Sequence, residues 1–202
     1  MASAPRLLVV LDGSPLAGSS VHKLLLAACE GARAAGGEVA LHRAYAMHIQ
    51  PCIACGPNAA VPNYCIFHDA MDEVYAQLER AHAVIVGSPI YFDTVSGPLK
   101  LLIDRCNCIT PLVRLADGTE DCVPLWQRTR RAAFVTACSS DHRYDLAERT
   151  VRGFCKWIGA QWEETVAWQH PDNEKGTVPE SLIARSRALG ERLVRSEPLA
   201  AG

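Results

Sequence analysis

The sequence lacks an excess of charge of either sign. Its 20 lysine and arginine residues are balanced by 22 aspartate and glutamate residues, which gives a formal net charge of -2 at pH 7. Proteins that bind nucleic acid or a membrane surface usually carry a basic patch, and this sequence has no polybasic run. We therefore expect no nucleic acid and no membrane among the partners, and small molecules or other proteins instead.

Long hydrophobic runs are missing as well. The first apolar run, residues 7–11, is short and ends at Asp12. A transmembrane helix needs about 20 apolar residues, and the core of a signal peptide needs about 7 to 15. We therefore expect a cytoplasmic protein, in which the nine cysteines are reduced thiols or metal ligands and not a disulfide framework.

Two common nucleotide motifs are incomplete or absent. Residues 13–20 have the spacing of a Walker A loop, but Ser19 stands where the lysine belongs, so ATP is disfavoured. No G-x-G-x-x-G occurs, which argues against a dinucleotide site. What remains is a hydroxyl-rich turn before a helix, where amides and the hydroxyls of Ser14, Ser19 and Ser20 could hold a phosphate monoester. An ordinary turn with a serine cap is the alternative.

Five strands alternate with five helices along the chain. Three strands are apolar throughout, which is typical of burial on both faces, and two alternate with polar residues, which is typical of sheet edges. The apolar strands lie at residues 6–12, 83–86 and 132–137, and the alternating ones at 38–44 and 162–168. This pattern predicts a flavodoxin-like doubly wound, five-stranded parallel sheet of order 2-1-3-4-5 with helices on both faces.

The length of 202 residues and the apolar content of 49% suffice for one core, so we expect a single domain over residues 1–202. Two long inserts, at about 45–68 and 108–130, have no sustained period and are expected to be irregular loops. Asp69 and Asp145 are predicted to begin capping boxes of the helices that follow them. Ser96 is predicted to cap the helix after the third strand.

Ligands of open α/β sheets bind beyond the carboxyl ends of the strands, where the strand order reverses. Here that position lies between the turn at 13–20 and the segment at 88–95. The second segment begins within Gly87-Ser88-Pro89-Ile90-Tyr91-Phe92, in which proline stiffens the backbone and two aromatic residues could lie beside a flat cofactor.

These segments resemble a known family. Gly13-Ser14-Pro15, Gly87 to Phe92, and Val95-Ser96-Gly97-Pro98-Leu99-Lys100 to Asp104-Arg105 are similar to the NAD(P)H-dependent FMN reductases and the iron-sulfur flavoproteins. The resemblance implies FMN as cofactor, with Ser14, Ser19 and Ser20 on its phosphate and Ser88, Pro89, Ile90, Tyr91 and Phe92 along the isoalloxazine. The family completes its site with a third, usually glycine-rich loop, which corresponds to residues 136–141 here and has no glycine. Cys138 and Ser139 of this stretch follow a strand at the carboxyl edge and are expected at the site, with packing in the core as the alternative for Cys138.

The activity implied is an FMN-dependent NAD(P)H oxidoreductase, using NADPH or NADH and a small electron acceptor such as a quinone, flavin, nitro compound or metal ion. The flavin carries the chemistry, so no catalytic side chain is expected. A homodimer or homotetramer is expected. The alternatives are a flavodoxin-like electron carrier, which the net charge of -2 disfavours, an iron-sulfur flavoprotein, and a non-catalytic flavin-binding regulator.

The cysteines bear on the alternative of an iron-sulfur flavoprotein. Iron-sulfur members of the family carry a compact C-x-x-C-x-x-C run and a fourth cysteine, whereas Asn58 stands at the third position here. We therefore expect no metal, unless Cys52, Cys55 and Cys65 are completed by Cys106 or Cys108. Finally, Lys100, Asp104 and Arg105 are expected to form ion pairs at the surface or at a subunit interface.

Overall fold

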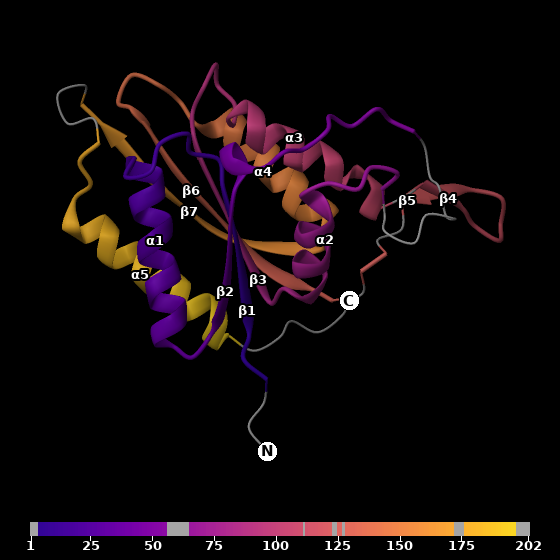
Figure 1. The fold of residues 1–202 in the computed structure, drawn as a ribbon, viewed down its shortest axis with the longest axis horizontal. Helices are drawn as coiled ribbons and strands as arrows, with labels where there is room; N and C mark the ends of the chain where they lie inside the picture. Colours follow the sequence, from indigo (N-terminus) through magenta and orange to yellow (C-terminus); the bar gives the residue numbers. More distant parts are fainter. Residues whose placement is uncertain are drawn as a thin grey trace.

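The centre of the molecule is a five-stranded parallel sheet of order β2-β1-β3-β6-β7 (Figure 1). The computed structural model describes residues 4–55, 65–110, 112–122, 125–126, 128–171 and 176–196. The sheet consists of β1 (Leu7–Asp12), β2 (Glu38–Arg43), β3 (Ala83–Pro89), β6 (Arg130–Ser139) and β7 (Ala160–His170). In chain order this is 2-1-3-4-5, so the predicted topology, with the alternating strands at the two edges, is confirmed.

Helices cover both faces of the sheet (Figure 1). One face carries α1 (Ser20–Ala34) and α5 (Glu180–Arg195), and the other carries α2 (Met71–Arg80), α3 (Gly97–Arg105) and α4 (Asp145–Trp157). Two short 3-10 helices, η1 (Ala44–Ala46) and η2 (Cys106–Ile109), follow β2 and α3. No helix in these described ranges has both the length and the apolar composition needed to cross a bilayer.

The central strands are apolar throughout because each contributes to two hydrophobic cores. Leu7, Val9 and Leu11 point into the core under α2, α3 and α4, while Leu8 and Val10 point into the core under α1 and α5. All five side chains are at most 2% exposed. Successive side chains of a strand alternate between faces, so a strand covered on both sides needs an apolar residue at every position.

The two helices on the α1 face cross in direct contact at glycines. A Cβ atom added to Gly31 of α1 would lie 1.9 Å from the carbonyl oxygen of Arg187, and one added to Gly190 of α5 would lie 1.8 Å from that of Ala28. Neither position has room for a side chain. The crossing therefore fixes α5 against α1.

Two details of these elements differ from the sequence prediction. β3 continues through Ser88 and Pro89, because both residues pair with β6, at Thr136 and Ala137. The N-cap of α4 is Tyr144 without a side-chain cap bond, so the capping box predicted at Asp145 is wrong. The carboxylate of Glu148 instead accepts hydrogen bonds from Arg152 and Thr165.

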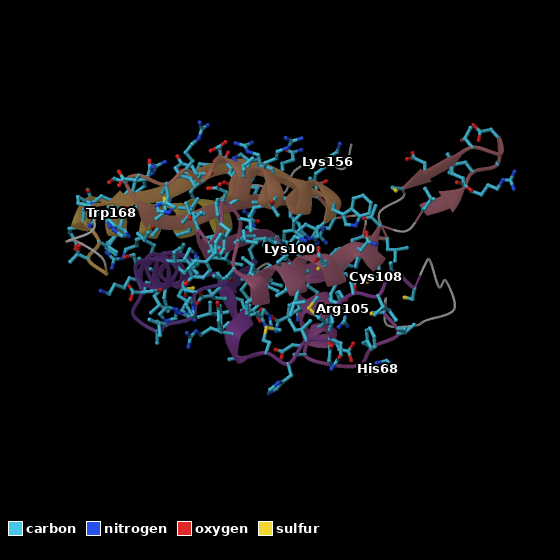
Figure 2. All side chains as sticks on the ribbon, turned by 90° about the horizontal axis from the view of Figure 1, so that it is seen from above. His68, Lys100, Arg105, Cys108, Lys156 and Trp168 are labelled. Atoms are coloured by element: carbon cyan, nitrogen blue, oxygen red, sulfur yellow. The ribbon has the colours of Figure 1, made fainter. Side chains whose placement is uncertain are left out.

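The second insert is not wholly irregular. It contains an antiparallel hairpin of β4 (Leu112–Arg114) and β5 (Glu120–Cys122), which extends away from the sheet and its helices (Figures 1 and 2). Its turn is held by a hydrogen bond from the Leu115 amide to the Thr119 carbonyl and by Asp117, which accepts from the Thr119 amide and hydroxyl. Strands of three residues are too short to produce a recognisable period.

Candidate functional site

Three loops meet at the carboxyl edge of the sheet. We call them the first loop (13–19, between β1 and α1), the second loop (90–96, between β3 and α3) and the third loop (140–144, between β6 and α4). The amide of Gly13 donates to the carbonyl of Gly87 at 2.7 Å, which joins the start of the first loop to β3, just before the second loop. The strand order reverses between β1 and β3, so this edge is where an α/β sheet of this kind binds its ligand.

The first loop offers backbone donors to an anion. The amides of Leu16, Ala17, Gly18 and Ser20 donate to no acceptor in the described ranges. They lie at the N-terminal end of α1, where the helix dipole also favours negative charge. The buried hydroxyl of Ser96 lies against Gly13 and likewise has no hydrogen-bond partner. These unmatched donors fit the phosphate of a ligand.

The three predicted serines have different environments. Ser19 is the N-cap of α1, and its hydroxyl accepts from the His22 amide at 3.3 Å. The hydroxyl of Ser20 donates to the carbonyl of Thr177 at 3.3 Å. Ser14 is fully buried, and both its amide and its hydroxyl donate to the carboxylate of Asp12. A phosphate would therefore compete with the Asp12 carboxylate for the hydrogen of the Ser14 hydroxyl. Ser19 and Ser20 lie at the N-terminal end of α1.

Ser88 joins the two ends of the second loop through its hydroxyl. Its hydroxyl donates to the carbonyl of Pro89 at 2.7 Å and accepts from the amide of Ser96 at 2.9 Å. Its own carbonyl accepts from Thr136 at 2.8 Å. Ser88 is fully buried, so its role within the protein is to hold both ends of the second loop. Ser96 occupies the predicted N-cap position of α3 but makes no side-chain cap bond.

The tip of the second loop is a tight, strained turn. Tyr91 and Thr94 exchange two backbone hydrogen bonds around Phe92 and Asp93, whose φ angles are 49° and 60°. Two successive left-handed residues define a type I′ turn, which normally contains asparagine and glycine. Phe92 is fully exposed, Tyr91 is 44% exposed and Ile90 is buried. The turn thus holds two aromatic side chains at the open edge, where a flat ring system could lie.

The third loop approaches this tip. Arg143 forms an ion pair with Asp145 at 2.8 Å, which raises the pKa of Arg143, and the charge of Asp93 at the tip of the second loop raises this pKa further. Cys138 is 7% exposed, its thiol donates to the carbonyl of His142 at 3.7 Å, and burial raises its pKa. Ser139 is half-buried at the end of β6. Cys138 and Ser139 therefore stand at the base of the third loop.

Sequence reasoning missed four residues near this edge. Burial raises the pKa of Tyr45 in η1, and Tyr91 on the second loop raises it further. Asp12, His22 and Arg43 form a polar cluster under the first loop. The sequence did carry a signal for Asp12, which is a charged residue directly after a fully apolar strand.

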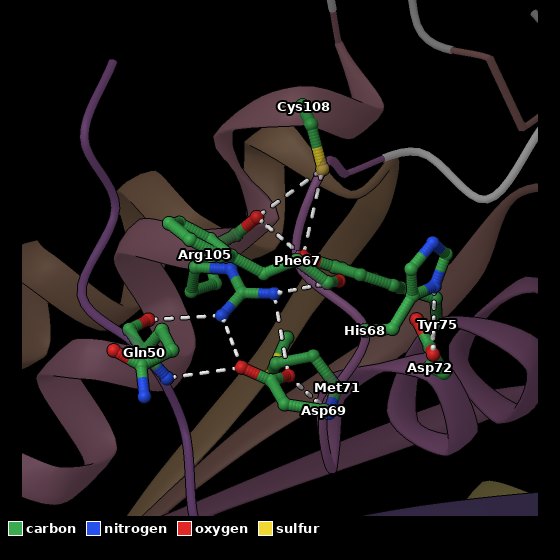
Figure 3. A network of polar contacts seen from close by, with 9 residues as sticks. All are labelled: Gln50, Phe67, His68, Asp69, Met71, Asp72, Tyr75, Arg105 and Cys108. Carbon is green, nitrogen blue, oxygen red and sulfur yellow. Dashed lines mark hydrogen bonds and ion pairs between the residues drawn. The ribbon is translucent and has the colours of Figure 1, made fainter. Parts of the chain in front are cut away.

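Arg105 anchors the first insert, which corrects the expectation of a surface or interface ion pair. Its side chain is 1% exposed, and its guanidinium donates to Asp69 at 2.6 Å and to the carbonyls of Gln50 at 2.9 Å and Phe67 at 3.5 Å (Figure 3). It therefore joins both ends of the insert at 45–68 to α3. Lys100 and Asp104, by contrast, form the expected exposed pair, at 2.6 Å.

Asp69 has a different role from the predicted capping box. Its carboxylate accepts from the amides of Met71 and Gln50 as well as from Arg105. Partial burial alone would raise the pKa of Asp69, but these hydrogen bonds outweigh it and lower the pKa below the ordinary value. The N-cap of α2 is Ala70, without a side-chain cap bond.

The cysteines named as possible cluster ligands lie in different environments. Cys52 and Cys55 are exposed, Cys65 is buried, and Asn58 lies outside the described residues. Within the described ranges, no group of three or more histidine, cysteine, aspartate or glutamate side chains could hold a metal ion. Cys106 is fully buried, which raises its pKa well above the ordinary value, and a thiol of this kind is a poor metal ligand.

The topology and the three open loops define the class of protein, an α/β domain of the flavodoxin type. Residues 6–164 match the family described as NADPH-dependent FMN reductase, so the chain belongs to that family. Among solved structures, an NAD(P)H:quinone oxidoreductase from Methanothermobacter marburgensis has a TM-score of 0.67 at 16% identity, covering 94% of this chain and 100% of its own. An NADH:FMN oxidoreductase in its apo form has a TM-score of 0.59 at 15% identity, covering 96% and 92%. At such identities the likeness concerns the fold.

Curated relatives are similar over shorter stretches. An iron-sulfur flavoprotein from Methanosarcina thermophila is 34% identical over 95 residues, which cover 47% of this chain and 49% of the relative. A second, from Methanocaldococcus jannaschii, is 39% identical over 74 residues, which cover 37% of each chain. The chain thus spans about half or less of the length of the curated relatives that it matches.

Proposed function

We propose that the protein is an FMN-dependent NAD(P)H oxidoreductase that passes electrons to a small acceptor. The observation that carries the proposal is the pairing of unmatched amides at the start of α1 with exposed aromatic side chains on the neighbouring second loop. The first feature suits the phosphate of FMN and the second suits its ring. Membership in the NADPH-dependent FMN reductase family supports the same cofactor.

The division of labour follows from the residues present. When bound, FMN supplies the two-electron chemistry between nicotinamide and acceptor. The first loop would hold the phosphate through amides and the hydroxyls of Ser19 and Ser20. Ile90, Tyr91 and Phe92 would orient the ring and shape the place where the substrates enter. Residues 87–92 contain no histidine, aspartate or glutamate, so the second-loop segment supplies no acid or base.

The acceptor is a quinone, a free flavin, a nitro compound or a metal ion, and the nicotinamide is NADPH or NADH. The test uses protein reconstituted with FMN and assayed for oxidation of each nicotinamide with each acceptor class. We expect FMN-dependent oxidation with at least one pair. If FMN binds and no pair gives turnover, the enzyme proposal is wrong.

One observation favours a second function, that of an electron carrier. Phe92 is fully exposed at the tip of the second loop, so a protein partner could dock directly at this edge. A carrier would bind FMN and exchange electrons with a redox protein without oxidising NADPH or NADH, so the same assay separates the two functions. We also propose a homodimer or homotetramer, since the aromatic tip is exposed in the single chain. Light scattering of the purified protein tests this state.

A further inference from the structure

A buried carboxylate lies under the first loop. Asp12 ends β1, and its side chain is fully buried. One carboxylate oxygen accepts from the Ser14 amide at 2.8 Å and from the Ser14 hydroxyl. The other pairs with Nδ1 of His22 at 2.7 Å and lies 3.4 Å from Nε of Arg43. Four segments therefore converge on one carboxylate, namely β1, the first loop, α1 and the end of β2.

The first consequence concerns the shape of the first loop. Ser14 lies at its start and His22 lies in the first turn of α1, so Asp12 binds the chain on both sides of the unmatched amides. The carboxylate thereby closes the loop around those donors. Such a clamp fixes the amides before any ligand arrives, which reduces the cost of ordering them on binding.

The second consequence concerns charge. An ionised Asp12 next to the first loop repels a phosphate, and residues 13–20 contain no lysine or arginine to offset it. Arg43 is the permanent cation in contact with this carboxylate, and it comes from β2, outside all three loops. The parallel register places it directly beside Asp12. Its Nε is buried and donates no hydrogen bond, so the contact is one of charge.

We propose that Arg43, by neutralising Asp12, determines the preference of the first loop for a flavin that carries a phosphate over one that ends in a hydroxyl. Arg43 is thus a positioning residue that acts through Asp12. This inference rests on the proposed binding of FMN. It assigns the phosphate selectivity to a residue on a strand that contributes nothing to the three loops.

The experiment compares FMN with riboflavin, which differ only in the phosphate. Dissociation constants of the full-length protein are measured by flavin fluorescence for wild type, Arg43→Met and Arg43→Lys. We expect Arg43→Met to weaken FMN binding by about tenfold and to leave riboflavin binding within about twofold. Arg43→Lys keeps the charge and is the matched control, so it should retain most of the preference for FMN.

A double variant tests the route through Asp12. Adding Asp12→Asn to Arg43→Met removes the anion that Arg43 offsets, while the asparagine oxygen can still accept from Ser14. FMN binding should recover toward the wild-type value. Equal losses of FMN and riboflavin in Arg43→Met, or no recovery in the double variant, would overturn the inference while leaving FMN binding intact. Failure of the wild type to bind either flavin would overturn both the inference and the proposed function.

Discussion

At the scale of single residues, the ion pair of Arg105 with Asp69 joins α3 to the segment before α2 inside the protein. Arg105 continues the buried spacing of Leu99 and Leu102 along α3, three residues after Leu102. The charged side chain nevertheless suggested the surface, because arginine is rarely buried unless it is paired. The partner, Asp69, lies 36 residues away in sequence. No local pattern connects the two, so only the fold could reveal the pair.

The buried pair should be costly to break. Asp69→Asn leaves the Arg105 guanidinium buried without its counter-charge, and we expect a loss of about 3–5 kcal/mol in the free energy of unfolding. The matched control is Asp104→Asn, which removes an exposed pair and should cost less than about 1 kcal/mol. Urea denaturation of both variants at pH 7 measures the difference. Equal losses in the free energy of unfolding would show that Asp69 stabilises the protein no more than an exposed carboxylate does.

The same pair predicts an acid dependence. Folding lowers the pKa of Asp69, so the unfolded chain takes up the proton first as the pH falls. The stability from this carboxylate is therefore complete above the ordinary aspartate pKa of about 3.9 and is lost as the pH falls through the lower folded value. Wild type should lose stability over that range more steeply than Asp69→Asn, as measured by urea denaturation at a series of pH values.

The serines of the first loop give a third test at this scale. Replacing Ser14 and Ser20 together by alanine should weaken FMN binding, by about 1.5–3 kcal/mol for each hydrogen bond to the phosphate that is lost. Ser14 also holds Asp12, so part of its effect acts through the clamp. Riboflavin is the control ligand, because it has no phosphate to lose. Unchanged FMN affinity in the double variant would contradict the assignment of the phosphate to this loop.

At the scale of elements, residue patterns predicted the long elements and missed the short ones. The order of the five main strands followed from which strands were apolar throughout, because burial on both faces leaves no polar position. The hairpin of β4 and β5 was missed, since its described side chains are all exposed and no apolar pattern marks it. The last two residues of β3 were missed because Ser88 and Pro89 are typical of turns, yet they pair with β6.

The contact between α1 and α5 can be tested by comparing a glycine inside it with a glycine on α4 where an added methyl group touches no neighbour. Gly190→Ala places a methyl group against the backbone of Ala28, and we expect a loss of about 1–3 kcal/mol as the helices move apart. Gly153→Ala on α4 meets no atom within 4 Å, so it should stabilise the protein by about 0.5–1 kcal/mol through helix propensity. Thermal unfolding of the two variants should therefore shift in opposite directions.

At the scale of the whole molecule, the loops of the candidate site could be placed from sequence more reliably than the contacts of their side chains. The position of the three loops follows from topology alone. The direction of each side chain does not, because it depends on neighbours such as Asp12, which turns the Ser14 hydroxyl inward. The electrostatic effect of Tyr91 on Tyr45 likewise depends on the fold, because β2 ends at the same edge of the sheet as β3.

The purified protein should contain flavin and little iron. The described cysteines supply no set of cluster ligands, and a cluster requires four thiolates. Absorption spectra and iron and sulfide analysis of anaerobically purified protein measure this. Stoichiometric iron and sulfide that disappear in a Cys52→Ser or Cys65→Ser variant would show that the first insert does assemble a cluster.

The contacts between α1 and the segment before α5 also determine when, during synthesis, the first loop gains its support. The hydroxyl of Ser20 and the amine of Lys23, both in the first turn of α1, donate to the carbonyls of Thr177 and Gly176 just before α5. Lys23 and Gly176 are 153 residues apart in sequence. During synthesis the first loop therefore leaves the ribosome well before the segment that supports its helix. A nascent chain can therefore form the contacts that support the proposed anion site only after residues 176 and 177 have been translated.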